Sequence, residues 1–254
     1  MDKFIDLNAD IGEASSPQWA AHETAILDYV SSANIACGGH AGDMQTMMNT
    51  AAAAQGRGVN IGAHPAYPDR KNFGRLPLKL GEDINPKALS ESLYEQISRM
   101  MDAAKGAVKY VKPHGALYNQ AAENAQLADL IGDAVLRIDH ALGWLGAPRS
   151  AMTQAAKARG ISFTAEAFID RRYDDQGYLT ARTQDGAIIE TNDARIAQAL
   201  NLAQDQSVVS IGGKTISIKA RSLCVHGDSQ GAVKTARLTR KALEKSGFHI
   251  KAFT

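Results

Sequence analysis

The feature that most restricts the fold of this chain is a repeated alternation of short apolar runs with amphipathic helical segments. Seven runs of four or five residues have the length and composition of buried β-strands. They are Phe4–Leu7, Ser32–Ala36, Val59–Ala63, Val108–Val111, Ala141–Leu145, Ile161–Ala165 and Ser222–Val225. Strands that are separated by helices pair in parallel through crossover connections. The alternation therefore predicts an α/β protein built on a parallel sheet.

The segments between these runs carry clear helix signals. One helix has apolar residues at the i, i+3, i+4, i+7 and i+8 positions of a single buried face. These residues are Met44, Met47, Met48, Ala51 and Ala52. Asp43 precedes this stripe and is well placed as its N-cap. Asn85 followed by Pro86 predicts the start of another helix, because proline suits the first helical position.

Seven parallel strands in 254 residues fit either an open doubly wound sheet or a closed barrel. An open sheet concentrates its site at one crevice. In this sequence, the segment after nearly every strand is polar and rich in glycine, as expected when all the loops meet at one barrel mouth. The pattern therefore favours a barrel. No proline- or serine-rich linker divides the chain, so we expect one domain over residues 1–254.

Composition and charge exclude several classes of function. The chain has 28 basic and 27 acidic side chains, and no block of like charge that would attract nucleic acid or an acidic membrane. It has no apolar run of about 20 residues and no N-terminal signal region. Its two cysteines, Cys37 and Cys224, are expected as free thiols. We expect a cytoplasmic protein that acts on a small molecule, with neither nucleic acid nor membrane as a partner.

Four of the seven histidines stand directly after predicted strands. They are His40 in CGGHAGD, His64 in IGAHPAYPD, His114 in VKPHGALYN and His226 in CVHGDS. Glycine, proline or small residues flank each of them and allow tight turns of the backbone. One such histidine is as easily a structural group, but four at equivalent strand ends should converge at the barrel mouth. The sequence therefore predicts a polar site there.

The carboxylates fit the same arrangement. Asp6, Asn8 and Asp10 alternate along the first strand, so they share its inward face if the strand continues. Inward-facing carboxylates in a barrel need partners or a chemical task. Glu13 follows them in the segment DLNADIGE. Asp228 follows the last strand and is placed either to join the site or to cap the last helix.

Cationic residues supply the remaining chemistry. Lys112 precedes Pro-His-Gly at a strand end, where its ammonium could stabilise an oxyanion or contact phosphate. Two connections, residues 64–85 and 166–190, are longer than is usual in compact domains and are predicted to be lids or binding loops. The second connection offers anchors for a substrate carboxylate, to which arginine binds in bidentate fashion. These are Glu166, Asp170, Arg171, Arg172 and Tyr173, and Arg75 and Arg182 could do the same from neighbouring loops.

Known short motifs give no further assignment. The segment GGKT at residues 212–215 resembles the end of a P-loop, but Val208 stands where that motif requires a glycine. It also lies in a predicted β-hairpin that turns at Gly212 and Gly213. The chain has no HExxH, no paired CxxC and no GxGxxG segment. A divalent metal remains an alternative without support from local ligand spacing; its ligands would be His40, His64, His226 and Asp10.

These segments together resemble the LamB/YcsF family over essentially the whole chain. The matching segments are DLNADIGE (6–13), SANIACGGHAGD (32–43), IGAHPAYPD with FGR (61–75), VKPHGALYN (111–119), EAFIDRRYDDQGYL (166–179) and LCVHGD (223–228). The resemblance implies a distorted, TIM-like (β/α)-barrel of seven or eight strands, of the glycoside hydrolase and deacetylase type. It also implies hydrolysis of the lactam 5-oxo-L-proline to L-glutamate, with ATP as co-substrate and 5-oxoprolinase subunits B and C as partners.

Residue chemistry suggests how such a reaction would be divided within the site. Opening a lactam requires an anchor for the substrate, a general acid and base, and a cation at the activated oxygen. The catalytic candidates are Asp10, Lys112 and His114. The substrate-binding candidates are Asp6, Asn8, Glu13, His40, His64, Glu166, Arg171, Arg172, His226 and Asp228. Two alternatives stay open: a metal-dependent amidohydrolase or carbohydrate deacetylase on the same barrel, and a non-catalytic component that binds the lactam.

Overall fold

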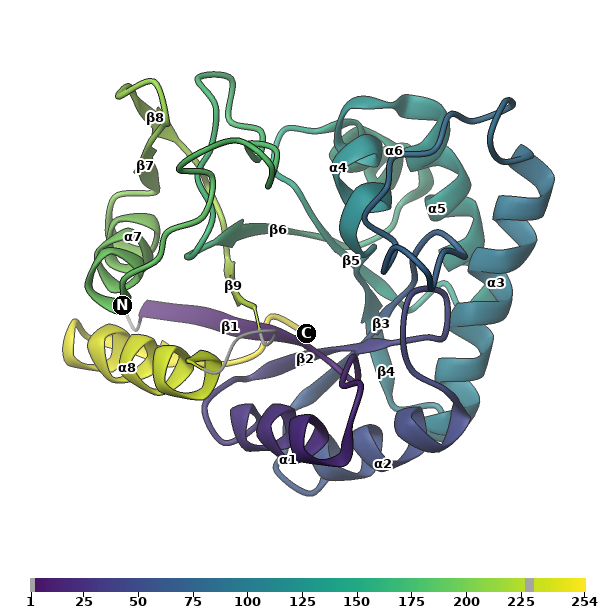
Figure 1. Ribbon diagram of the computed structural model, residues 1–254, viewed down its shortest axis with the longest axis horizontal. Coiled ribbons are helices and arrows are strands. Elements are labelled where there is room, and N and C mark those ends of the chain that lie inside the picture. Colours follow the sequence, from purple (N-terminus) through teal and green to yellow (C-terminus); the bar gives the residue numbers. More distant parts are fainter. Residues whose placement is uncertain (1–2, 227–230) are drawn as a thin grey trace.

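The computed structural model describes residues 3–226 and 231–254 of the chain. Its centre is a parallel β-sheet that closes on itself (Figure 1). In the described residues, the strands of this barrel are β1 (Lys3–Ile11), β2 (Ser32–Ala36), β3 (Asn60–His64), β4 (Val108–Val111), β5 (Gly143–Gly146), β6 (Phe163–Phe168) and β9 (Ser222–Val225). Each pairs with the next in this order, and β9 pairs back to β1. The predicted barrel is confirmed.

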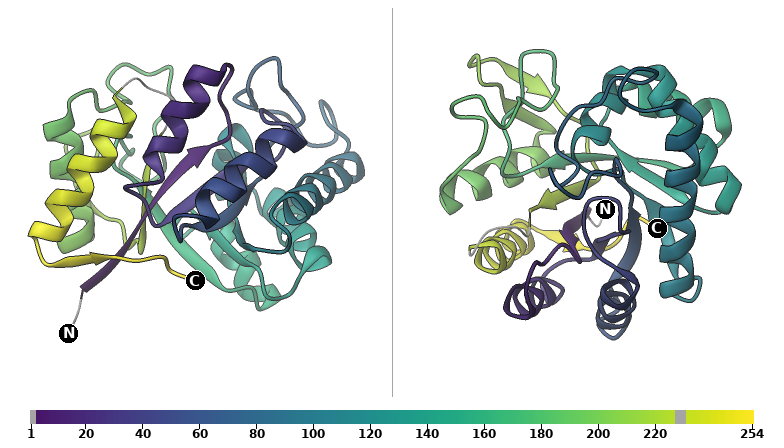
Figure 2. Two further views of the ribbon diagram at one scale, coloured as in Figure 1. Left: turned by 90° about the horizontal axis from the view of Figure 1, so that it is seen from below. Right: turned by 45° about the vertical axis from the view of Figure 1, so that its right-hand side comes forward.

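Helices surround the outside of the strands, as Figure 2 shows from two further directions. They are α1 (Pro17–Ile26), α2 (Met44–Gln55), α3 (Pro86–Ala103), α4 (Gly115–Glu123), α5 (Ala125–Ile138), α6 (Ala151–Arg159), α7 (Asn192–Gln204) and α8 (Ala232–Lys245). The two predicted caps are present. The Asp43 carboxylate accepts a hydrogen bond from the Thr46 backbone N–H at 2.8 Å, and the Asn85 side chain accepts from Lys87 and Ala88 at the start of α3.

Two smaller elements lie outside the barrel. Strand β10 (Phe248–Ile250) pairs with the first residues of β1. Strands β7 (Ser207–Val209) and β8 (Thr215–Ser217) form the predicted antiparallel hairpin, so the GGKT segment does not open a helix. Among the described helices, none combines the length and the apolar character needed to cross a membrane.

Strand β1 shows how side-chain alternation divides the protein into two layers. It extends to Ile11, four residues beyond the predicted end, because its polar residues pair inside the barrel instead of ending the strand. Leu7 and Ile11 are fully buried in the apolar core. Asn8 and Asp10 project the other way and both accept hydrogen bonds from Asn34 of β2 at 2.7 Å. The apolar core therefore lies between strands and helices, and the barrel interior is polar.

Candidate functional site

Asp6 forms the deepest polar layer inside the barrel. It is 1% exposed and accepts hydrogen bonds from Ser31 Oγ and Ser32 Oγ, both at 2.7 Å, and from Ser222 Oγ. Burial raises the pKa of Asp6 to about 6, although the three serine hydrogen bonds oppose the shift. Asp6 does not line the cavity described below, so its position does not support the predicted contact with substrate.

Asn8 belongs to the next layer and also lies beneath the cavity. It is fully buried, and its amide donates to Glu166 Oε1 at 2.9 Å and to Ser222 Oγ at 2.7 Å. It accepts from Asn34, which also donates to Asp10 Oδ1. Asn8 therefore holds the Glu166 carboxylate in place, and its predicted contact with substrate is not supported by this position.

Lys112 lies at the floor of the cavity, directly after strand β4. Its Nζ is 2.8 Å from Asp10 Oδ1, 2.9 Å from Glu166 Oε1 and 3.2 Å from Cys224 Sγ. Burial alone would lower the pKa of Lys112, but the surrounding acidic groups, Asp10 foremost, raise it well above its ordinary value. The side chain is thus a permanent ammonium ion in a buried setting.

Asp10 is the matching anion. Its burial favours the neutral acid, but the Lys112 ammonium outweighs this effect and holds the pKa of Asp10 well below its usual range. The His64 Nε2 atom lies 3.5 Å from Asp10 Oδ2. Asp10 is therefore ionised at neutral pH and is a weak base.

Glu13 and three histidines form a cluster at the ends of four successive strands, β1 to β4. The Glu13 Oε1 atom lies 2.8 Å from His40 Nε2, 3.3 Å from His114 Nδ1 and 3.9 Å from His64 Nε2. The rings of His40 and His114 are stacked in parallel with centroids 3.7 Å apart. Burial lowers the pKa of His40, and it lowers that of His114 well below the ordinary value, so both rings are neutral at pH 7.

These four residues are also a group whose ligand atoms all lie within 4.8 Å of one another. The sequence suggested a different metal set, in which His226 and Asp10 accompanied His40 and His64. In the structure, Glu13 and His114 accompany His40 and His64 instead. The sequence signal for Glu13 is its position just after β1, where it reaches the same barrel mouth as the histidines.

Two glycines allow the loop of residues 64–85 to approach this cluster. A Cβ atom on Gly74 would lie 3.1 Å from His40 Cβ and 3.2 Å from His114 Cδ2. Gly115 has a φ of +55°, and a Cβ atom there would lie 2.7 Å from the Gly74 carbonyl oxygen. This close contact brings the Phe73 carbonyl to 3.0 Å from His114 Nε2. The loop therefore orients a histidine of the site.

His226 lies at the end of β9 and pairs with Asp170, which follows the neighbouring strand β6. Its Nδ1 atom is 2.9 Å from each carboxylate oxygen of Asp170, and its ring stacks against Phe168. Burial opposes ionisation of Asp170, but His226 outweighs it and lowers the pKa of the carboxyl group. The sequence offered Asp170 as a possible anchor for the substrate carboxylate, but it did not predict the pairing with His226. The position of Asp170 two residues beyond β6, on a strand adjacent to that of His226, is the signal that identifies this pairing.

The site opens into a cavity of about 530 Å³, within the range typical of small-molecule sites. Among its lining residues are Asp10, Glu13, His64, Lys112, His114 and His226, with Arg75, Arg171 and Arg182 from the loops. Arg171 is 4% exposed and donates to the Thr180 carbonyl at 2.6 Å. Burial, with Arg182 nearby, lowers the pKa of Arg171 to about 10. Three of the four predicted strand-end histidines thus line this cavity, whereas His40 does not line it and instead contacts Glu13 and His114.

One candidate, Arg172, lies outside the cavity. Arg172 is partly exposed and is not among the residues that line the cavity, although its backbone N–H donates to the Ala187 carbonyl at 2.8 Å. Its side chain therefore does not share the position of Arg171. Asp228 lies outside the described residues.

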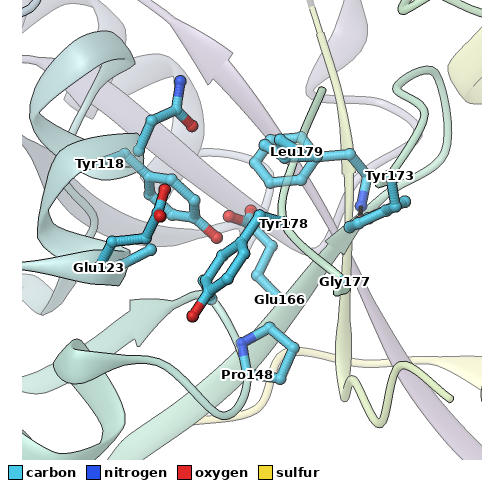
Figure 3. A pocket seen from close by; sticks show the side chains of 12 residues that line it. Tyr118, Glu123, Pro148, Glu166, Tyr173, Gly177, Tyr178 and Leu179 are labelled. Carbon is cyan, nitrogen blue, oxygen red and sulfur yellow. Dashed lines mark hydrogen bonds between the residues drawn. The ribbon is translucent and has the colours of Figure 1, made fainter. Parts of the chain in front are cut away.

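A smaller pocket of about 30 Å³ adjoins the cavity and shares Tyr118, Phe168 and Leu179 with it (Figure 3). Within the described part of the chain, the Tyr118 hydroxyl and Glu166 Oε2 are buried without a hydrogen-bond partner. A volume of this size admits about one water molecule or one small polar group. The residues that line the pocket therefore include a hydroxyl donor at Tyr118 and a carboxylate acceptor at Glu166.

Comparison with known proteins identifies the family of this chain. Residues 5–254 match the LamB/YcsF family. A relative from Erwinia tasmaniensis, named as the A subunit of 5-oxoprolinase, is 41% identical over 255 residues, which cover 98% of this chain and 99% of the relative. The similarity thus extends from the first barrel strand to the end of the chain.

Solved structures agree with this relationship. A lactam utilization protein from Thermus thermophilus has a TM-score of 0.88 at 33% identity, covering 98% of this chain and 100% of that protein. The peptidoglycan deacetylase PdaC from Bacillus subtilis has a TM-score of 0.52 at 11% identity, covering 99% of this chain and 88% of that structure. The second likeness shows a shared barrel fold only. The chain belongs to the LamB/YcsF family.

Proposed function

We propose that this chain is the A subunit of an ATP-dependent 5-oxoprolinase, which hydrolyses 5-oxo-L-proline to L-glutamate together with subunits B and C. Its 41% identical relative carries the name of that component, and its structural neighbour is named for lactam utilization. The observation that carries the proposal is the buried Lys112 ammonium at the floor of a cavity with arginines at its rim. Such a site suits a small substrate that has both a carboxylate and a developing negative charge at oxygen.

The chemistry explains why a cation is needed at the floor. A five-membered lactam is a resonance-stabilised amide, and transfer of the terminal phosphoryl group of ATP to its oxygen makes the ring carbon electrophilic. Attack by water and cleavage of the C–N bond then give L-glutamate, with ADP and phosphate as the other products. In this proposal, the Lys112 ammonium, which lines the cavity, stabilises negative charge at the lactam oxygen as a preorganised electrostatic contribution. Arg171, a buried arginine of the cavity lining, binds the substrate carboxylate in this proposal.

The proton acceptor in this proposal is His226. Asp10 is a weak base because its pKa is held low, and both ring nitrogens of His114 already face the Phe73 carbonyl and His64. His226 lines the cavity, and the Asp170 carboxylate fixes its ring through Nδ1. A carboxylate that orients a histidine is a recurring arrangement for a general base. Of the catalytic candidates, Asp10 and His114 are therefore less suited to acid–base chemistry than the His226–Asp170 pair.

Two considerations support the inclusion of ATP and of partner subunits in the proposal. The resemblance to the LamB/YcsF family implies both, and the cavity has an open mouth. The sequence has no recognised nucleotide motif, and the cavity mouth lies between two long loops, residues 64–85 and 166–190. An activated lactam phosphate would be hydrolysed wastefully at an open mouth, so closure by a partner would protect it. We expect the isolated chain to show little or no turnover.

The test is glutamate release from 5-oxoproline and ATP, measured for the purified chain alone and after addition of subunits B and C. Activity only in the complete mixture supports the proposal. Full turnover by the chain alone would show that the partners are dispensable. No glutamate from a mixture that forms the complex and binds ATP would refute the function itself.

A second candidate, hydrolysis of an amide or an acetylated sugar by a metal-dependent enzyme, is favoured by the Glu13 and histidine cluster. A third, lactam binding without catalysis, would require only the cavity. Acetate release from N-acetylated oligosaccharides by the chain alone would favour the second. Tight 5-oxoproline binding with unchanged turnover in the His226→Ala variant would favour the third.

A further inference from the structure

We propose that Glu13, His64 and His114, with His40 beside them, bind one divalent transition-metal ion. The proposal deepens the proposed function, because it concerns the same cavity, but metal binding does not depend on the 5-oxoprolinase reaction. The predicted set of ligands, which included His226 and Asp10, is replaced by the cluster that the structure assembles at the ends of β1 to β4.

The first argument comes from the protonation of the two central histidines. His64 Nδ1 lies 2.7 Å from the Lys112 carbonyl, and His114 Nε2 lies 3.0 Å from the Phe73 carbonyl. A carbonyl only accepts, so each of these ring nitrogens carries the hydrogen. The other two nitrogens, His64 Nε2 and His114 Nδ1, then face each other at 3.0 Å as two lone pairs. A cation between the lone pairs relieves this repulsion.

The hydrogen bonds to backbone carbonyls are themselves a feature of metal sites. Histidine ligands commonly donate their second ring N–H to a carbonyl or carboxylate, which fixes the tautomer and the ring orientation. His64 and His114 both do so, from different strands and to carbonyls of different segments. Their ligand atoms are thus oriented towards each other before any ion arrives.

The second argument is the spacing of the ligand atoms. With bond lengths of about 2.0–2.1 Å to nitrogen and oxygen, neighbouring ligands of a tetrahedral ion lie roughly 3.3–3.4 Å apart. In the cluster, the three separations among Glu13 Oε1, His64 Nε2 and His114 Nδ1 are 3.0, 3.3 and 3.9 Å. These values bracket the tetrahedral spacing. His40 Nε2 touches the same Glu13 oxygen at 2.8 Å and is available as a fourth ligand.

The third argument is charge. The carboxylates of Asp10 and Glu166 share a single buried ammonium, that of Lys112, whereas the Glu13 carboxylate faces histidine rings; all three acidic side chains are no more than 8% exposed. Buried charges require compensation. A divalent cation beside Glu13 and Asp10 would balance the excess of negative charge.

The donor set identifies the class of ion. Imidazole nitrogens with one carboxylate suit Zn²⁺ and similar transition metals, whereas Mg²⁺ and Ca²⁺ prefer oxygen ligands. An ion of this class supplies Lewis-acid polarisation of a bound carbonyl oxygen. Glu13, His64 and His114 also line the cavity, so the site would be accessible to a small ligand.

The experiment measures metal binding directly, without ATP or partner subunits. The full chain is treated with chelator, and Zn²⁺ and Co²⁺ are titrated separately by calorimetry, with the visible absorption spectrum of Co²⁺ as a second readout. We expect one ion per chain and a Co²⁺ spectrum of low coordination number. The variants His64→Ala and His114→Ala should weaken binding at least about 100-fold, beyond the 10–100-fold typical of losing an outer-shell partner.

Controls separate this cluster from other histidines. His226→Ala and His140→Ala should bind the ion like the wild type, because neither residue belongs to the cluster. Glu13→Gln keeps the size of the side chain and serves if an alanine variant fails to fold; it should weaken binding at least about 10-fold. The absence of stoichiometric uptake by the folded chain would overturn the proposal, as would unchanged uptake in folded Glu13→Gln. The separate assay of glutamate release decides the proposed function independently.

Discussion

Lys112 Nζ lies 2.8 Å from Asp10 Oδ1, and this ion pair joins strands β4 and β1 across the interior of the barrel. The two strands are not neighbours in the sheet, because β2 and β3 lie between them. The pair therefore connects opposite parts of the barrel and places a permanent positive charge at the cavity floor. The stability of the barrel and the proposed chemistry of the cavity therefore both depend on the ion pair between Lys112 Nζ and Asp10 Oδ1.

Replacement of Lys112 by methionine should impair both properties. It leaves Asp10 and Glu166 buried without their cation, and breaking one side of a buried ion pair costs roughly 3–5 kcal/mol. Glutamate formation by the assembled enzyme should fall by about 10²-fold or more. Urea denaturation and initial rates measure the two effects. Lys109→Met is the matched control, since Lys109 lies on strand β4, which Lys112 directly follows, but is exposed; equal behaviour of the two variants would contradict the proposed role.

The variant His226→Ala should lower turnover by about 10²-fold, the scale of losing a general base, while leaving the fold intact. Asp170→Asn should lower turnover and alter the pH–rate profile, because the amide no longer holds the histidine as the carboxylate does. Steady-state assays of the complete complex provide the measurement. His140→Ala, an exposed histidine, should be silent. Wild-type turnover in His226→Ala would remove this residue from the mechanism.

Arg171→Lys should raise the KM for 5-oxoproline by about 10- to 100-fold with a smaller effect on kcat. A lost charge-assisted hydrogen bond costs about 1.5–3 kcal/mol, and lysine cannot form the bidentate contact. Arg172→Lys is the neighbouring control and should retain the wild-type KM, because Arg172 is not among the residues that line the cavity. If both variants behaved alike, the carboxylate anchor would have to be sought elsewhere.

Asp6 should make the protein less stable as pH rises. Its pKa is raised from 3.8 to about 6, so the folded state favours the neutral acid. The resulting stability is fully present below pH 3.8, is lost as pH rises through about 6, and does not return above it. Between pH 4 and pH 7, the free energy of unfolding of the wild type should fall by about 2 kcal/mol relative to Asp6→Asn. Urea titrations of both proteins at the two pH values measure this difference; a constant difference would contradict the shift.

Gly115→Ala should destabilise the cavity wall. The substitution combines a left-handed φ of +55° with a Cβ atom 2.7 Å from the Gly74 carbonyl oxygen. Gly106→Ala has a φ of +77° but no atom within 4 Å of its Cβ position, so it carries only the backbone cost of about 1–2 kcal/mol. Gly115→Ala should therefore unfold at a clearly lower temperature than Gly106→Ala. Equal melting temperatures would show that the loop of residues 64–85 accommodates the added Cβ atom without destabilising the protein.

The sequence determined the barrel and most of its strands. Alternation of apolar runs and helices is a local property, because each run must bury a face and each crossover must return the chain. Alternation within β1 likewise indicated that Asn8 and Asp10 face inward. Four histidines after strands were enough to predict a shared polar region, since parallel strands end on the same side of a barrel.

Tertiary structure decided how that region is divided. Glu13 joins His40, His64 and His114 because β1 to β4 lie side by side and end together, while His226 pairs with Asp170 because β9 lies beside β6. Asp6 and Asn8 share the inward face with Asp10 but lie beneath the cavity, a difference of depth that alternation does not encode. Residue type and spacing fix which face a side chain takes. Barrel closure and the path of the loops fix the height at which it meets its partners.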